Sequence, residues 1–246
     1  MQKSKMAIVA ALAATCVSAL AADPPKSDWT IAGNAGLFSD YRFRGISQTN
    51  KKPAFQGGLD ISHASGFYVG NWNSNIDSAF YNGSNLEMDF YGGYKKSVGD
   101  LGFDVGLLQY YYPGAKTGGG EKYDTLEGYI GASWKWLSAK YSYTFSDYFG
   151  LVNSDGSGYL DLAFTMEVAP KLNLVAHYGM QTVKNYDPLD YNDWKLGVTY
   201  DLAGWILGAA YVDTDADKGL YTLTNSQGKS KDLGGSTVVL SIMKTF

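Results

Sequence analysis

Apolar and polar residues alternate with a period of two along much of the chain. In "LEMDFYGGYK", Leu86, Met88 and Phe90 fall on one face of an extended segment, and Glu87 and Asp89 fall on the other. The same alternation recurs in "LEGYIGASWKW" and in "YLDLAFTMEV". A period of two is typical of β-strands, because successive side chains of a strand point to opposite faces. The pattern therefore predicts an all-β fold.

The alternating segments predict about twelve antiparallel strands. Their expected ranges are 29–44, 54–62, 66–73, 85–96, 100–111, 124–136, 137–147, 157–168, 171–182, 192–202, 204–214 and 235–246. The joins alternate in length, because tight turns such as Val98-Gly99 are followed by long polar segments such as "YPGAKTGGGEKY" and "VKNYDPLDY". Short turns on one rim and long loops on the other are the organisation of a transmembrane β-barrel of the outer membrane.

Alternation alone also fits a secreted, soluble β-sandwich or barrel whose apolar face points inward. Several predicted strands run to about 10–13 residues, which is longer than usual and matches a tilted membrane crossing. Aromatic residues such as Trp134, Trp136 and Trp205 lie near strand ends on the apolar face, where a membrane interface favours them. These features favour a membrane barrel, in which the strands close into a ring so that every backbone group is paired.

The first residues have the organisation of a secretory signal peptide. Lys3 and Lys5 precede an apolar run over 6–20, and Ala19-Leu20-Ala21 offers small residues to a signal peptidase. The run spans about 15 residues, whereas a membrane-spanning helix needs roughly 20. We therefore predict a signal peptide over 1–21 and a barrel over 22–246. Cys16 lies inside the signal, so the mature chain would have no disulfide, thiolate metal ligand or cysteine nucleophile.

Composition and charge support this class. The 246 residues include 20 Tyr, 11 Phe, 6 Trp and 30 Gly, a mixture that favours strands and turns. The net charge of −4 becomes more negative once Lys3 and Lys5 are removed, which argues against a nucleic-acid partner. The last segment, "STVVLSIMKTF", ends on Phe246. A terminal aromatic on an alternating strand resembles the signal that outer-membrane proteins offer to the barrel-assembly machinery.

Several stretches of the chain resemble a known family. "SDYRFRGISQT", "PAFQGGLDISHASGFYVGNW", "EMDFYGGY", "DVGLLQYYYPG" and "YDTLEGYIG" are similar to the TorF-type porin family of bacteria, long recorded as conserved hypothetical proteins. The likeness covers nearly the whole mature chain in the same order, and the first stretch is its most specific part. The resemblance implies an outer-membrane β-barrel that forms a pore, and it brings no catalytic residues.

If the apolar faces meet lipid, the polar faces line the lumen. Continuing the alternation of the first strand places Tyr41 and Phe43 toward lipid. The predicted pore-lining residues are Asp40, Arg42, Arg44, Glu87, Asp89, Asp104, Glu127, Lys140, Asp161 and Glu167. Acids outnumber bases among them, which predicts a modest cation preference. Alternatively, these charges pair across the lumen and plug it, as arginine pairs well with carboxylates.

We expect a porin in the outer membrane of a Gram-negative bacterium, with both termini periplasmic and six long loops outside. It would contact lipid and lipopolysaccharide, pass small hydrophilic solutes by diffusion, and need neither cofactor nor metal; its oligomeric state stays open. A second hypothesis is a closed barrel that acts as a receptor or adhesin through its loops, which a blocked lumen would favour. A third is a hydrolase in which His177 activates a serine, with Ser142, Ser146 and Asp161 as candidate neighbours.

Two further motifs are weak. Gly228-Lys229-Ser230 resembles the end of a phosphate-binding loop, but Leu223 stands where that motif needs its first glycine. "DTDADKG", residues 213–219, spaces its carboxylates as a Ca²⁺ loop does, but its glycine comes one place late and Thr224 stands at the final glutamate position. We interpret both as solvated loop, with weak divalent-ion or lipopolysaccharide bridging at "DTDADKG" as the alternative.

Overall fold

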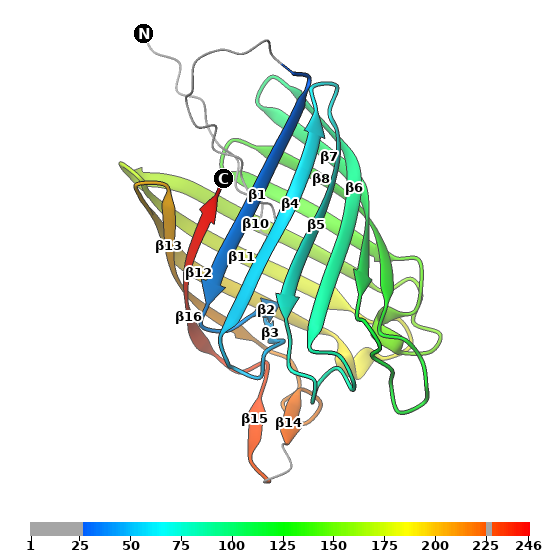
Figure 1. The fold of residues 1–246 in the computed structure, drawn as a ribbon. Coiled ribbons are helices and arrows are strands. Elements are labelled where there is room, and N and C mark those ends of the chain that lie inside the picture. The colour runs from blue at the N-terminus through cyan, green and yellow to red at the C-terminus, as the bar shows by residue number, and fades with distance from the viewer. Residues whose placement is uncertain (1–26, 225–227) are drawn as a thin grey trace.

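The computed structural model describes residues 27–224 and 228–246, and in these residues twelve antiparallel strands form a closed barrel (Figure 1). The predicted signal peptide lies outside the described residues. Around the ring the order is β1-β16-β13-β12-β11-β10-β9-β8-β7-β6-β5-β4. The bounds are β1 Trp29–Phe38, β4 Ala54–His63, β5 Phe67–Asn75, β6 Leu86–Val98, β7 Leu101–Tyr111, β8 Thr125–Trp134, β9 Leu137–Thr144, β10 Gly158–Ala169, β11 Leu172–Thr182, β12 Tyr191–Leu202, β13 Trp205–Thr214 and β16 Thr237–Thr245. The predicted strand number and closure are confirmed.

The connections alternate in length as the sequence predicts. Short turns such as 99–100 and 203–204 join strands at one end, which is the upper end in Figure 1. The long segments lie at the other end, and they carry the remaining short elements: β2 Arg42–Phe43, β3 Ile46–Ser47, η1 Tyr148–Gly150, η2 Asp187–Leu189, β14 Thr222–Thr224 and β15 Ser230–Asp232. We call these the short-turn end and the long-loop end. No helix among the described residues is long and apolar enough to span a membrane.

The outer face of the barrel is apolar. Along β7, Leu101, Phe103, Val105 and Leu107 point outward with 45%, 49%, 52% and 52% exposure, while Asp104 between them accepts a hydrogen bond from another lumen-facing side chain. The alternation of the sequence thus places the apolar side outward. A soluble barrel would bury that side, so the outward direction favours a barrel whose surface is covered by lipid.

The ring closes between β1 and β16, over five register pairs from Asn34–Thr245 to Phe38–Ser241. Beyond them, the Gly33 N–H donates to the Phe246 carbonyl at 2.7 Å, and the Phe246 N–H donates to the Gly33 carbonyl at 2.9 Å. A Cβ atom at position 33 would lie 2.7 Å from the Phe246 ring, so the absence of a side chain on Gly33 gives the ring its place. The terminal aromatic residue therefore takes part in closing the barrel.

One predicted strand is wrong in its extent. The alternation predicts a first strand over 29–44, but β1 ends at Phe38 and the chain folds into the lumen as the β2–β3 hairpin. Tyr41 and Phe43 are consequently buried, at 4% and 7% exposure, instead of facing lipid. The chain bends at Ser39 and Asp40, directly after β1, and the Asp40 carboxylate accepts hydrogen bonds from Arg42, Ser47 and Thr49. The hairpin then reverses at Arg44-Gly45, where both residues have positive φ (46° and 79°). Apolar and polar residues keep alternating past the bend, so the pattern does not show where the strand ends.

The outward apolar face yields a depth-dependent prediction. Val105 lies near the middle of β7 and Val98 is the last residue of β6, and both are exposed on the outer face. We expect Val105→Arg to destabilise the barrel in lipid vesicles by about 2–4 kcal/mol and Val98→Arg by about 0–1 kcal/mol, because a charge costs most at the bilayer midplane. Denaturant titration of the folded fraction on gels measures both values. Equal costs at the two depths would contradict a lipid-covered outer face.

Candidate functional site

The segment from Ser39 to Pro53, which we call the plug, lies inside the ring at the long-loop end (Figure 1). Its centre is Asp40. The Ser47 Oγ and Thr49 Oγ1 hydroxyls donate to Asp40 Oδ1 at 2.6 and 3.1 Å, and Arg42 Nε donates to Asp40 Oδ2 at 2.6 Å. Because these groups are buried, their mutual hydrogen bonds replace those lost to water. The plug is therefore a hairpin with a polar core of its own.

The side chain of Arg44 connects the plug to the opposite wall of the barrel. Its Nη2 lies 2.8 and 2.7 Å from the two carboxylate oxygens of Glu127, and its Nη1 donates to Gln181 Oε1 at 2.9 Å. Glu127 belongs to β8 and Gln181 to β11, strands on the far side of the ring from β1. The guanidinium also lies 4.4 Å from the centre of the Tyr159 ring. The side chains of the ion pair are only 6% and 2% exposed. The predicted pairing of arginine with a lumen acid therefore exists for Arg44.

Arg42 joins the plug to the last long loop, residues 215–236. Its Nη1 donates to the carbonyls of Leu233 and Gly235 at 2.9 and 3.2 Å, and the Ser47 N–H donates to the Leu233 carbonyl at 3.0 Å. Leu233 is itself 1% exposed. The described part of this loop around Leu233 and Gly235 thus packs against the plug.

Aromatic side chains fill the space around the plug. The Tyr41 ring packs edge-on against Trp72 at 5.3 Å between centroids, and Phe43 does the same against Tyr110 at 5.5 Å and Phe149 at 5.6 Å. Such edge-to-face pairs add to the free energy gained by burying the rings. If this region of the lumen were a water-filled passage, the side chains of its wall would be exposed to solvent. The side chain of Glu127, which belongs to the wall, is only 1% exposed. The long-loop half of the lumen is filled.

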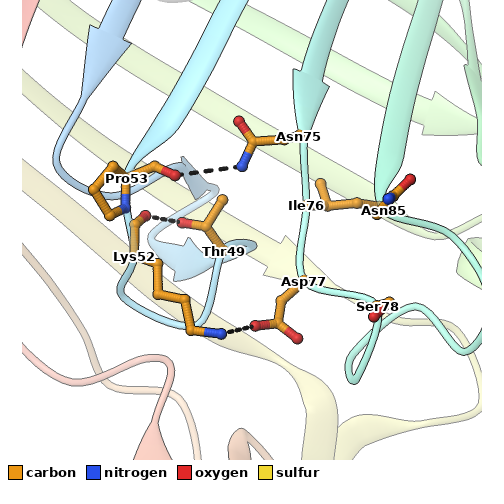
Figure 2. A pocket seen from close by; sticks show the side chains of 8 residues that line it. All are labelled: Thr49, Lys52, Pro53, Asn75, Ile76, Asp77, Ser78 and Asn85. Carbon is orange, nitrogen blue, oxygen red and sulfur yellow. Dashed lines mark hydrogen bonds and ion pairs between the residues drawn. The ribbon is translucent and has the colours of Figure 1, made fainter.

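A polar groove marks the surface seam between the plug and the loop over 76–85 (Figure 2). Its volume is about 250 Å³, and its lining is Thr49, Lys52, Pro53, Asn75, Ile76, Asp77, Ser78 and Asn85. Lys52 Nζ lies 2.8 Å from Asp77 Oδ2 in this groove, and the Asp77 N–H donates to the Gln48 carbonyl at 2.9 Å. The loop therefore contacts the plug through one ion pair and one backbone hydrogen bond.

Two predicted lumen acids of β6 lie against the plug without a basic partner. The Tyr41 hydroxyl donates to Glu87 Oε1 at 3.2 Å, but Glu87 Oε2 and Asp89 Oδ1 have no hydrogen-bond partner among the described residues. Glu87 is 1% and Asp89 4% exposed. Buried carboxylate oxygens without a partner are costly when charged. These two carboxyls are therefore polar groups of the wall that the described residues leave incompletely satisfied.

The remaining predicted lumen residues lie toward the short-turn end. Asp104 accepts from the Tyr68 hydroxyl at 2.6 Å and is 29% exposed at its side chain, and Lys140 Nζ lies 5.6 Å from the Tyr129 ring centre. Glu167 is exposed and accepts the Lys171 backbone N–H at 3.0 Å. Water thus reaches charged side chains in this half. Whether the predicted residues line a conducting pore stays a prediction.

His177 sits between two carboxylates in the barrel wall. Its Nδ1 is 3.1 Å from Asp161 Oδ1 and its Nε2 is 2.8 Å from Asp193 Oδ1, while the Tyr159 hydroxyl donates to Asp193 Oδ2 at 2.8 Å. The predicted neighbour Asp161 is confirmed. The hydrolase hypothesis needs a serine hydroxyl on one ring nitrogen, whereas both nitrogens face carboxylates. Of the candidate serines, Ser146 accepts the Leu126 N–H at 2.9 Å.

The carboxylates of "DTDADKG" bond to the protein itself. Asp215 accepts from the backbone and side-chain nitrogens of Asn192 at 2.5 and 2.8 Å, and Asp217 accepts the Gly219 N–H at 2.7 Å. Within residues 27–224 and 228–246, no group of three or more His, Cys, Asp or Glu side chains is placed to hold a metal ion. The segment therefore has the contacts of a structured loop.

Comparison with known proteins identifies the family. The family described as "Bacterial protein of unknown function (Gcw_chp)" matches residues 22–246, so the chain belongs to it. A search of curated protein sequences returned no match. Among solved structures, the KdgM porin is similar with a TM-score of 0.53 at 7% identity, covering 88% of this chain and 98% of that one. The NanC porin is similar with a TM-score of 0.51 at 12% identity, covering 88% and 99%. The chain thus folds as a porin-type barrel.

The alternation of the sequence predicts that the residues binding Arg44 face the lumen, but it does not single them out. Tyr159 occupies the lumen-facing position before Asp161 on β10, and Gln181 lies two lumen-facing positions after His177 on β11, but neither is charged. The hairpin turn could be predicted only from Arg44-Gly45, a glycine-containing pair between two short alternating segments. Which residues meet across the ring depends on the strand register, and no local pattern records that.

Gly45 allows a test of the plug that changes no charge. A Cβ atom there would clash with Thr214 Cγ2 and would lie 2.6 Å from Asp193 Cβ, at a φ of +79°. We expect Gly45→Val to loosen the plug by about 1–3 kcal/mol and to speed trypsin cleavage after Arg42 and Arg44.

The control is Gly114→Val, because Gly114 has a φ of +76° but nothing within 4 Å of its Cβ position. Peptide mapping of timed digests measures the cleavage after Arg42 and Arg44. Equal cleavage in both variants would show that the plug does not pack against the barrel wall at Gly45.

Proposed function

We propose that this member of the Gcw_chp family is an outer-membrane porin whose lumen is closed by the plug and conducts when the plug moves. The observation that carries the proposal is that β2 and β3 form a sheet separate from the barrel sheet. Displacing the plug therefore breaks no ladder of the ring. The Ser39 N–H still donates to the Leu240 carbonyl of β16, and beyond Ser39 the plug is held by side-chain and loop contacts, chiefly those of Arg44 and Arg42.

The proposed cargo is small hydrophilic solutes, with a modest preference for cations. Asp104 and Asp161 face the lumen in every position of the plug, because they belong to barrel strands. Glu127, Glu87 and Asp89 would join them once the plug leaves. Charged side chains around a passage set the field that an ion meets, so this excess of acids supports the proposal of cation preference.

The proposed location is the outer membrane of a Gram-negative bacterium. The apolar outer face, with Val105 at its middle, supports contact with lipid hydrocarbon, and the long loops would meet lipopolysaccharide. The resemblance of "SDYRFRGISQT" and the other stretches to the TorF-type porin family agrees with this assignment. Export by the signal peptide over 1–21 and delivery to the assembly machinery through Phe246 belong to the same proposal.

The filled lumen also favours a second candidate, a closed barrel that acts as a receptor or adhesin through its loops. In that case the plug is permanent and only the outer surfaces of the loops function. The two candidates differ in one measurable property, which is whether ions pass when the plug is loosened.

Conductance of the refolded protein in planar bilayers tests the proposal. We expect the wild type to show rare opening and Arg44→Ala to open far more often, since removing one partner of a buried ion pair costs about 3–5 kcal/mol. Even half of that cost changes the ratio of open to closed states more than tenfold. A reversal potential in a salt gradient gives the sign of the selectivity. Lys218→Ala, which removes an exposed loop charge, is the matched control.

Absence of conductance steps in folded Arg44→Ala and in folded Glu127→Gln would contradict the porin proposal and support the closed barrel. Heat-dependent migration on gels shows whether each variant has folded, so a silent channel is distinguished from a misfolded one.

A further inference from the structure

The surroundings of Arg44 form a cation pocket in the barrel wall. Glu127 supplies both carboxylate oxygens, Gln181 supplies an amide oxygen, and Tyr159 supplies an aromatic face. These three side chains belong to β8, β11 and β10, whereas the guanidinium that occupies the pocket belongs to the plug. The pocket is therefore a feature of the ring, and it would persist if Arg44 left.

Two further hydroxyls hold the pocket in shape. The Tyr110 hydroxyl donates to Glu127 Oε2 at 3.3 Å, and the Tyr148 hydroxyl lies 3.1 Å from Gln181 Oε1. Both tyrosines are buried. Because their partners are the same oxygens that bind the guanidinium, Glu127 and Gln181 are oriented before any cation binds.

The charge of Glu127 favours a cation in this pocket. Without Arg44, Glu127 would be a buried carboxylate with no basic partner. A buried charge that has lost its counter-charge is strongly unfavourable. A positively charged ligand would restore the pairing that Arg44 makes with Glu127, which an anion or a neutral solute would not do.

The shape selects a planar cation. The two terminal nitrogens of Arg44 bond to different partners, Glu127 and Gln181, while its Cζ lies over the Tyr159 ring, 4.4 Å from the ring centre. A guanidinium has donors in a fixed plane and stacks on aromatic rings, whereas an ammonium is a compact and strongly hydrated charge. The contacts of Arg44 therefore describe a receptor for guanidinium groups.

We propose that Glu127, Gln181 and Tyr159 form a binding site for small solutes that carry a guanidinium group, and that Arg44 of the plug occupies this site in the closed state. A solute of this class competes with Arg44 for Glu127 and thereby favours release of the plug. The binding step rests on the wall residues alone. The release step rests on the proposed porin function.

Chemical rescue tests the site with methylguanidinium as the probe. In Arg44→Ala the side-chain volume is vacated, so the probe should bind and raise the melting temperature of the full-length barrel. At a probe concentration about 100 times the dissociation constant, the folding equilibrium should shift about 100-fold. Arg44→Met is the matched control, because its side chain fills much of the same space without charge, and the probe should not stabilise it.

Three results would overturn the site. They are an unchanged melting temperature of Arg44→Ala with the probe, equal stabilisation of Arg44→Met, or equal stabilisation by the same concentration of tetramethylammonium, which has charge but no donors. Adding Glu127→Gln to Arg44→Ala should abolish the rescue, and a retained rescue would contradict the site as well. If Arg44→Ala folds poorly, the refolding yield with and without the probe gives the same comparison.

The channel measurement is kept separate from the binding measurement. Rescue of Arg44→Ala without conductance in any variant supports the guanidinium site and contradicts the porin proposal. Conductance of Arg44→Ala without rescue supports the porin proposal and overturns the site. In the wild type, methylguanidinium should raise the open probability more than tetramethylammonium does, and equal effects would overturn competition with Arg44.

Discussion

The ion pair between Arg44 and Glu127 is the interaction on which the state of the lumen depends. It joins a hairpin that follows β1 to a strand on the opposite side of the ring, and both side chains are almost fully buried. Two charges taken out of water contribute little when they are well paired, but the loss of either partner is costly. The pair therefore adds little to the free energy of folding, but it fixes the position of the plug in the lumen. The hydrogen bonds of Arg42 and Asp40 hold the rest of the plug in its folded shape.

The ring itself follows from a different constraint. A strand surrounded by lipid must have both edges paired, so twelve strands with an apolar outer face close upon themselves. This frees the inner face to be polar, and there the short-turn half and the long-loop half differ. Water reaches Asp104 near the short-turn end, whereas Glu127 is enclosed by the plug and its aromatic neighbours. Solvent thus reaches lumen-facing side chains toward the short-turn end, whereas side chains enclose Glu127 toward the long-loop end.

The sequence predicts the ring better than it predicts the plug. A period of two specifies which face of a strand is apolar, so β7 and the other barrel strands could be placed from local pattern alone. The same period continues past the bend at Ser39 and Asp40, where β1 has already ended, and it therefore predicts the wrong side for Tyr41 and Phe43. The prediction that Arg42 and Arg44 line a pore stays a prediction, and in the closed barrel both side chains are buried in contacts of the plug. That Arg44 meets Glu127, Gln181 and Tyr159 depends on contacts more than 80 residues apart, which only the closed ring determines.

A double-mutant cycle on Arg44 and Glu127 tests the central claim most directly. The free energy of unfolding is measured for the wild type, Arg44→Ala, Glu127→Gln and the double variant in the same lipid. If Arg44 bridges the lumen to Glu127, the two changes are coupled by at least about 1 kcal/mol, because each single change leaves the other partner buried and unpaired. Additivity within about 0.5 kcal/mol would mean that the two side chains do not interact, and it would contradict closure of the lumen by this pair.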